Sequence, residues 1–166
     1  MLCSRLIIRE SHAGDSDAIA LIERDAFGRD AEAEMALALI ASPPHTISLV
    51  AECNGRIIGH VLTTEIRAPV RAAAIAPLAV LPEFREMQVG SQLIREAIHR
   101  SRSEGFEALF VLGDNAYYER FGFNSHMADP FDIDWQGPNF MALELRDGAL
   151  SGNGGRLEYP QQFFAL

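Results

Sequence analysis

The sequence predicts an α/β sandwich, in which helices cover both faces of one mixed β-sheet. The clearest evidence is a β-hairpin over residues 48–66, where Asn54-Gly55 joins two strand-like runs and suits a type I′ turn. An almost entirely apolar run follows at 72–81, and such a strand is typically central and covered on both faces. A helix over 90–104 then connects it to a strand over 106–112, and a helical crossover makes the two strands parallel.

The other elements follow from hydrophobic periodicity and from residues that begin or end helices. Before the hairpin we expect a strand at 5–9, a helix from Asp15 or Ser16 to about Phe27, and a helix over 31–41 that Pro43 and Pro44 end. After residue 112 we expect a short helix over 116–121, two strands between 123 and 145 around an irregular stretch, and a Gly-rich tail that becomes strand-like. No repeat or linker divides the chain, so one domain is expected over 1–166.

The composition is that of a globular protein. Hydrophobic residues make up 48% of the 166 residues and charged residues 22%. No apolar run approaches the roughly 18 residues that a membrane span needs. The N-terminal residues lack an apolar run followed by a small-residue cleavage site, so neither a membrane segment nor a secretory signal is expected.

The charge and the cysteines restrict the partners and the compartment. The net charge is −9, and all 14 basic residues are Arg and are scattered along the chain, so no nucleic-acid partner is expected. Cys3 and Cys53 form no CxxC pair and have no metal-ligating neighbours. They are therefore expected to be structural residues of a cytoplasmic protein in a reducing compartment.

The segment from Leu81 to Ser91 has the features of an anion-binding turn. A buried strand ends, the chain turns at Pro82, and a helix begins at or near Gly90. The first turn of a helix offers unpaired N–H groups and the positive end of its dipole. Gly90 lacks a Cβ, so a phosphate could approach the backbone, and Arg85 could neutralise its charge. The alternative is an ordinary strand-to-helix turn in which Gly90 serves close packing.

Two further features favour the anion site. If the strands over 72–81 and 106–112 splay apart, the gap between them can admit a thioester arm that hydrogen-bonds to exposed strand amides. The run 113–123 follows the second strand directly and places Tyr117 and Tyr118 on a short helix close to that gap.

These two segments resemble the two signatures of the GNAT (Gcn5-related N-acetyltransferase) superfamily. Residues 78–94 resemble its acetyl-CoA motif, with Val80 and Pro82 ending the strand, followed by Arg85 and Gly90. They depart from it at Gln88, where the motif has its first glycine, and at Glu86 and Met87. The second signature is matched at four positions, namely Tyr118, Glu119, Gly122 and Phe123. The opening and closing segments are similar to the YhbS-like branch of predicted acetyltransferases, so the resemblance covers nearly the whole chain.

The resemblance implies a GNAT-type sheet that is mixed but mostly antiparallel, and direct acetyl transfer from acetyl-CoA in a ternary complex. It implies that backbone groups of Leu78 and Val80 hold the pantetheine arm, and that an N–H near Leu81 polarises the thioester carbonyl. Tyr118 would protonate the leaving thiolate; its alternative role is that of a core aromatic residue. The implied cofactor-binding residues are Leu78, Val80, Arg85, Met87, Gln88, Val89, Gly90 and Ser91.

The acceptor is expected to be a primary amine on a small molecule or a peptide. The base that deprotonates it is left open between Glu65, Asp114 and a water relay, and each of these carboxylates could equally be a solvated or helix-capping residue. The irregular loop over 125–139 could line the acceptor site. The carboxylates of the first two helices could border it or form a solvated face; they are Glu23, Asp25, Asp30, Glu32 and Glu34.

Two alternatives to this activity remain. The departures at Met87 and Gln88 favour a non-catalytic acyl-CoA-binding or regulatory module on the same fold. An enzyme that uses another acyl group or an oxygen acceptor would also fit. The five histidines are dispersed without ligand spacing, so no metal is expected, and the sequence is compatible with a homodimer.

Overall fold

The computed structural model describes residues 3–42 and 44–165. In chain order its main elements are β1 (Leu6–Glu10), α1 (Ser16–Phe27), α2 (Ala31–Ala41), β2 (Thr46–Cys53), β3 (Arg56–Ile66), β4 (Ala72–Val80), α3 (Val89–Ser103), β5 (Ala108–Leu112), α4 (Asn115–Glu119), α5 (Ser125–Ala128), β6 (Phe131–Asp132), β7 (Phe140–Glu144) and β8 (Gly155–Arg156). Short 3₁₀ helices lie at Ala13–Asp15, Pro82–Met87 and Gln161–Ala165. Pro43, one of the two prolines expected to end α2, lies outside the described residues.

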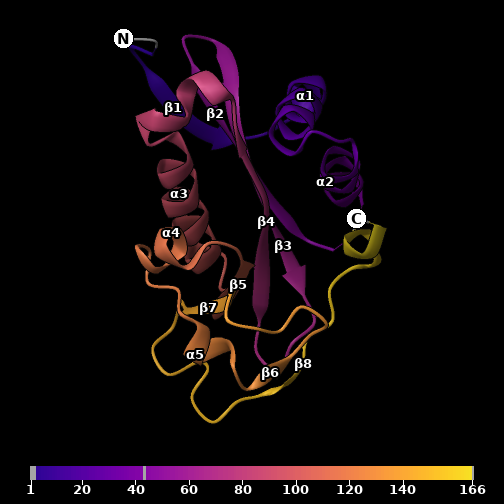
Figure 1. The fold of residues 1–166 in the computed structure, drawn as a ribbon, viewed down its shortest axis with the longest axis vertical. Coiled ribbons are helices and arrows are strands. Elements are labelled where there is room, and N and C mark those ends of the chain that lie inside the picture. Colours follow the sequence, from indigo (N-terminus) through magenta and orange to yellow (C-terminus); the bar gives the residue numbers. More distant parts are fainter. Residues whose placement is uncertain (1–2, 43, 166) are drawn as a thin grey trace.

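A six-stranded sheet in the order β1-β2-β3-β4-β5-β7 forms the centre of the molecule (Figure 1). Every neighbouring pair is antiparallel except β4 and β5, which are parallel. Helix α3 packs against β2 and β3 on one face, and α1 packs against β3 and β4 on the other. The predicted fold class is therefore confirmed. None of the helices in the described part of the chain is long and apolar enough to cross a membrane.

The predicted hairpin is confirmed at its turn. Asn54 and Gly55 both have positive φ, 52° and 84°, as a type I′ turn requires. Helices α1 and α2 end at the predicted residues. Asp15 precedes α1, but its carboxylate accepts hydrogen bonds from Arg9 and from the His12 N–H instead of capping α1.

The expectation of a strand just after residue 123 is wrong. Asn124 forms only an isolated bridge with Ala142, and its side chain accepts a hydrogen bond from the Met127 N–H to begin α5. Asparagine competes for backbone hydrogen bonds in this way, which is why it favours helix starts over strand interiors. The strand-like tail is also shorter than expected, because β8 has two residues and the chain then turns into a 3₁₀ helix.

The two cysteines are paired, which corrects the expectation of separate thiols. Cys3 and Cys53 form a disulfide with 5.6 Å between their Cα atoms, and 50 positions separate them in the sequence. The pairing follows from the sheet: Leu6 lies opposite Cys53, so the chain before β1 passes the end of β2. Disulfides persist mainly in oxidising compartments, so this pairing does not support the expected cytoplasmic location, which remains a prediction.

A buried hydrogen bond between a carboxyl group and an imidazole ring fastens α1 to the sheet. The Glu23 carboxylate lies 2.7 Å from Nδ1 of His60 on β3, and neither side chain is exposed to solvent. The other ring nitrogen of His60 lies 3.0 Å from the Ser48 hydroxyl. Burial raises the pKa of Glu23, while the contact with His60 opposes that rise.

Strand β4 is bent where the two halves of the sheet diverge. Its pairing with β3 shifts register between Val61 and Thr63, so Ala76 and Pro77 oppose the single residue Leu62. Such a bulge bends a strand. Its pairing with β5 stops after Ala74. The two parallel strands therefore splay apart beyond Ala74, which is the condition on which the expected gap depends.

Candidate active site

The turn before α3 adopts the form expected of an anion site. The chain leaves β4 through a 3₁₀ helix over Pro82–Met87, and Gln88 then takes a left-handed conformation with φ 61° and ψ 23° before α3 begins at Val89. Glycine is the residue that adopts this conformation most readily. Gln88 therefore adopts a conformation that suits glycine, at the position where the resembled motif has its first glycine.

Gly90 leaves room for the hydroxyl of Tyr117, a residue that the sequence did not assign to the anion site. A Cβ at Gly90 would lie 2.9 Å from the Tyr117 hydroxyl oxygen. This hydroxyl, the start of α3 and the end of β4 enclose a cavity of about 280 Å³. It is lined by Leu78, Ala79, Val80, Arg85, Gln88, Gly90, Ser91, Tyr117 and Arg120. We call it the polar cavity.

Two arginines supply positive charge to the polar cavity. Arg85 was predicted, and its Nε donates a hydrogen bond to the Val80 carbonyl at 3.2 Å. Arg120 was not predicted; its guanidinium lies 3.5 Å from the Gln88 side-chain oxygen and 3.5 Å from the Ser91 hydroxyl. It also stacks over Tyr117, with 5.4 Å to the ring centroid. The α3 N-terminus and these guanidiniums together form an electropositive end.

The backbone of β4 presents hydrogen-bonding groups to the gap. Leu81 donates its N–H to the Ile58 carbonyl at 2.8 Å, so the expected oxyanion contact cannot come from Leu81 itself. Because alternate residues of a strand point their N–H and C=O groups to opposite neighbours, this bond directs those of Leu78 and Val80 away from β3. They face the gap that opens beside β5.

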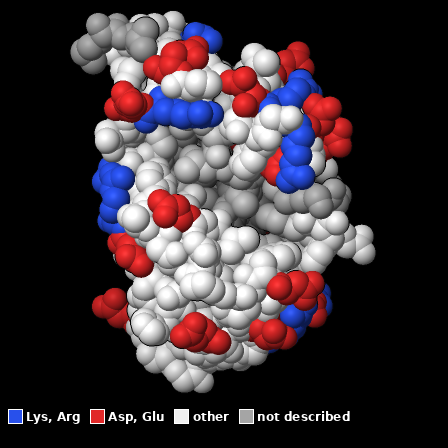
Figure 2. All heavy atoms as spheres, in the orientation of Figure 1, with Lys and Arg blue, Asp and Glu red and all other residues white. Residues whose placement is uncertain are grey.

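A larger cavity lies on the other side of the gap, with a volume of about 780 Å³. We call it the apolar cavity. Its lining comes from α1, α2, β4, the end of β5, α4 and the C-terminal segment: Phe27, Glu32, Met35, residues 74–78, residues 111–114, Tyr118, Asp134, Trp135, Tyr159, Phe163 and Phe164. Figure 2 shows a hollow over β4 on this face, with uncharged residues over much of the surface below it. Leu78 lines both cavities, so they meet at the gap.

Tyr118 lines the apolar cavity, as predicted for a residue beside the gap. Its ring packs edge-on against Tyr117 and Phe123, with centroids 5.0 and 5.9 Å apart. A Cβ at Gly113 would lie 2.6 Å from the Tyr118 ring, so glycine is required there for the ring to occupy this position. Burial, with a smaller effect of Tyr117, raises the pKa of Tyr118 to about 12. The hydroxyl therefore keeps its proton at neutral pH.

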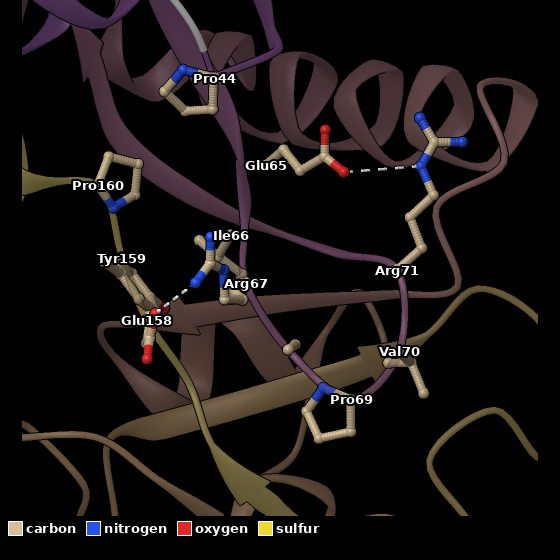
Figure 3. A pocket seen from close by; sticks show the side chains of 11 residues that line it. Pro44, Glu65, Ile66, Arg67, Pro69, Val70, Arg71, Glu158, Tyr159 and Pro160 are labelled. Atoms are coloured by element: carbon tan, nitrogen blue, oxygen red, sulfur yellow. Dashed lines mark hydrogen bonds and ion pairs between the residues drawn. The ribbon is translucent and has the colours of Figure 1, made fainter.

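The two carboxylates considered as the base lie in different places. Asp114 lines the apolar cavity with Tyr118. Glu65 instead lines a third cavity, of about 730 Å³, beside the turn that joins β3 and β4 (Figure 3). There it pairs with Arg71 at 3.8 Å, and Arg67 pairs with Glu158 at 3.4 Å. Only Asp114 is thus next to Tyr118.

Two weaker expectations about the acceptor side can also be placed. The irregular loop over 125–139 lines the apolar cavity through Asp134 and Trp135. Of the carboxylates on α1 and α2, only Glu32 lines the apolar cavity, and Arg29 holds both of its oxygens, at 2.9 and 2.6 Å. Among the residues that the structure describes, no group of three or more His, Cys, Asp or Glu side chains could hold a metal ion.

The comparisons with known proteins agree with this geometry. The acetyltransferase (GNAT) family profile matches residues 16–123. The uncharacterized N-acetyltransferase YhbS of Escherichia coli strain K12 is 31% identical over 164 residues, which is 95% of this chain and 98% of YhbS. The uncharacterized N-acetyltransferase YjhQ of the same strain is 37% identical over 123 residues, which is 69% of this chain and 67% of YjhQ.

Solved structures extend the agreement to the whole fold. The crystal structure of YhbS from Escherichia coli in complex with CoA superposes with a TM-score of 0.90 and 31% identity, covering 96% of this chain and 92% of that one. A GNAT family acetyltransferase from Brucella melitensis in complex with acetyl-CoA has a TM-score of 0.81 and 27% identity, covering 96% and 98%. The chain therefore belongs to the GNAT family of acetyl-CoA-dependent N-acetyltransferases, within which it is similar to YhbS.

Proposed function

We propose that this protein transfers the acetyl group of acetyl-CoA to a primary amine, by direct attack in a ternary complex. The observation that carries the proposal is the meeting of the two cavities at Leu78. One cavity is electropositive and suits phosphates, and the other contains the proton donor Tyr118. A thioester that lies in the gap would be reached by an acceptor from the opposite side.

The residues present fit acetyl-CoA. The backbone of Met87 to Ser91 would hold the pyrophosphate at the start of α3, supported by Arg85 and Arg120. Because Gly90 has no Cβ, the Tyr117 hydroxyl lies beside the start of α3, within the cavity that would hold the phosphates. The groups of Leu78 and Val80 that face away from β3 would hold the pantetheine arm as an additional strand. The Leu78 N–H replaces that of Leu81 as the donor to the thioester carbonyl.

The proton transfers follow from the two sides of the gap. Acetyl-CoA supplies an activated acetyl group and leaves as a thiol. The amine nitrogen bonds to the acetyl carbon as the carbon–sulfur bond breaks, and Tyr118 gives its hydroxyl proton to the sulfur. An acceptor that arrives as an ammonium first loses one proton to Asp114 or to water, the nitrogen loses a second proton as the amide forms, and solvent returns a proton to Tyr118. Asp114 is suited to this role because it lines the cavity beside Tyr118.

Acetyl-CoA binding and thiol release test the proposal together. Saturating acetyl-CoA should raise the melting temperature, and a panel of primary amines should then release free CoA thiol. Arg120→Ala should weaken acetyl-CoA binding by about 10-fold, because a charge-assisted contact to phosphate is lost. Arg146→Ala is the matched control, since Arg146 is exposed and lines neither cavity.

The outcomes separate the alternatives. Binding without thiol release from any amine would instead support an acyl-CoA-binding or regulatory module. Product masses that show another acyl group or an oxygen ester would support the related enzyme activities. If acetyl-CoA does not raise the melting temperature at saturation, both the enzyme and the binding module are contradicted.

A further inference from the structure

The residues that line the apolar cavity indicate which kind of acceptor fits, whereas those of the polar cavity concern only the cofactor. We infer that the acceptor is a primary amine on a bulky apolar body, aromatic or branched, that carries no carboxylate. This inference rests on the proposed function and narrows its substrate class. Three independent features of the cavity lining support it: its aromatic wall, its exposed apolar entrance and the sign of its charges.

The first feature is a set of interlocked rings. Trp135 packs edge-on against Tyr159, with 4.9 Å between the ring centroids, and lies 5.7 Å from Phe164. Tyr159 in turn packs edge-on against Phe163 at 5.1 Å. Burial raises the pKa of Tyr159. These contacts fix the rings before a ligand arrives, so a flat or branched apolar group meets a formed surface.

The second feature is apolar surface exposed at the entrance. In the described part of the chain, the exposed large hydrophobic side chains are Ile7, Leu21, Phe27, Leu112 and Phe164. Phe27, Leu112 and Phe164 all line this one cavity and are 42%, 54% and 53% exposed. They come from α1, β5 and the C-terminal segment, so they are far apart in the sequence. Apolar patches that gather in this way mark ligand grooves, because covering them is favourable.

The third feature is the sign of the charges. Among the described residues that line the cavity, the charged ones are all acidic: Glu32, Asp114 and Asp134. From outside the lining, Arg29 pairs with Glu32, and Arg156 pairs with both Asp134 and Asp132. Asp114 has no such ion pair among the described residues and lies next to Tyr118. An acceptor ammonium would therefore be attracted to the gap, whereas a carboxylate on the acceptor would meet no cation and a repelling charge.

The position of the entrance indicates that the acceptor, and not the cofactor, contacts these aromatic residues. The cofactor's phosphates belong to the polar cavity on the α3 side of the gap. The exposed rings of Phe27 and Phe164 line the apolar cavity and not the polar cavity. A ligand that enters there passes the aromatic wall and reaches Tyr118 with its amine.

A matched pair of amines tests the inference. 2-Phenylethylamine and phenylalanine differ only by a carboxylate, and ethanolamine lacks the apolar body. With acetyl-CoA at saturation, kcat/KM measured by thiol release should be at least about 10-fold higher for 2-phenylethylamine than for either of the others. Phe164→Ala should raise KM for 2-phenylethylamine and leave that for ethanolamine unchanged. Asp114→Asn should reduce the discrimination against phenylalanine.

A binding measurement makes the test independent of turnover. Trp135 is the only tryptophan in the chain, so its fluorescence reports directly on the wall. In the presence of CoA, 2-phenylethylamine should change this fluorescence with saturation, and phenylalanine at the same concentrations should not. Phe27→Ala offers a second entrance variant if Phe164→Ala fails to fold.

Each contrary result overturns the inference. It fails if phenylalanine or ethanolamine is the better substrate, or if no amine changes the Trp135 fluorescence. It also fails if hexanoyl-CoA is preferred to acetyl-CoA and produces the fluorescence change, because the wall then holds an acyl chain. In all of these cases acetyl-CoA still stabilises the protein. Loss of that stabilisation would instead contradict the proposed function.

Discussion

The polar and apolar cavities meet at Leu78 but are built in different ways. Seven of the nine described residues that line the polar cavity lie between residues 78 and 91, and the other two are Tyr117 and Arg120. The apolar cavity combines side chains from α1, α2, β4, β5, α4 and the C-terminal segment. A cofactor common to a whole family can be held by one local backbone motif, whereas an acceptor is selected by side chains that only the fold brings together. Variants in each cavity and at the junction between them test this difference.

The largest expected effect is at the junction of the two cavities. Tyr118→Phe should lower kcat by about 10²–10⁴-fold, because the leaving thiolate loses its proton donor. Affinity for acetyl-CoA should stay nearly unchanged, since the polar cavity keeps its lining. Single-turnover rates and calorimetric titration measure the two quantities. Unchanged turnover would remove Tyr118 from the chemistry and assign it to the core.

The pH dependence provides a control on that variant. Because the pKa of Tyr118 is raised to about 12, the hydroxyl keeps its proton across the working range. The rate should therefore rise with pH as the amine loses its proton. At pH values up to about 11, loss of the Tyr118 proton should cause no decrease in rate. A falling limb near pH 10 that disappears in Tyr118→Phe would show that this pKa is not raised.

The attachment of α1 to the sheet can be weakened without changing the residues that line the apolar cavity. Glu23→Ala should lower the free energy of unfolding by about 3 kcal/mol, because it leaves His60 buried without its carboxylate partner. Glu23→Gln, which keeps an acceptor oxygen, should cost less. Urea denaturation measures both variants, and Asp25→Ala is the matched control, an exposed carboxylate on the same helix. Equal losses for Glu23→Ala and Asp25→Ala would mean that the buried pair does not hold α1 on the sheet.

A smaller effect is expected on the cofactor side. Gly90→Ala should weaken CoA binding by about 10-fold, because the added Cβ would lie 2.9 Å from the Tyr117 hydroxyl and displace that ring. Combining it with Tyr117→Phe removes the hydroxyl oxygen and should restore most of the affinity. Calorimetric titration with CoA checks both variants. Without recovery in the double variant, the contact with Tyr117 is not the reason for glycine at this position.

The smallest effect is expected at Gln88. Its left-handed backbone is costly for a residue with a Cβ, so Gln88→Gly should raise the free energy of unfolding by up to about 1 kcal/mol. CoA affinity should change little, because the backbone amides keep their positions. Chemical denaturation and CoA titration measure the two quantities. A large gain in affinity would show that the glutamine side chain obstructs the site.

The contrast between the cavities also explains what could be predicted. The anion turn, Arg85, Gly90 and the position of Tyr118 beside the gap were predicted because they belong to short contiguous segments with characteristic chemistry. Arg120 was missed because nothing in its local sequence points to Ser91. The six aromatic rings that line the apolar cavity were not predicted as a group, since they come from residues 27 to 164 and no spacing relates them. The disulfide was missed for the same reason, because 50 residues separate its cysteines.

The sequence by itself determined the order of the elements from β1 to α4, the hairpin turn, the parallel crossover and the turn before α3, because each depends on neighbours within a few positions. The tertiary structure alone decided which carboxylate lies beside Tyr118, which side chains enclose the acceptor space and how Glu23 meets His60. Those relations depend on distances between remote segments, and these are fixed only when the sheet has twisted, β4 has bent away from β5 and the helices have packed on its faces.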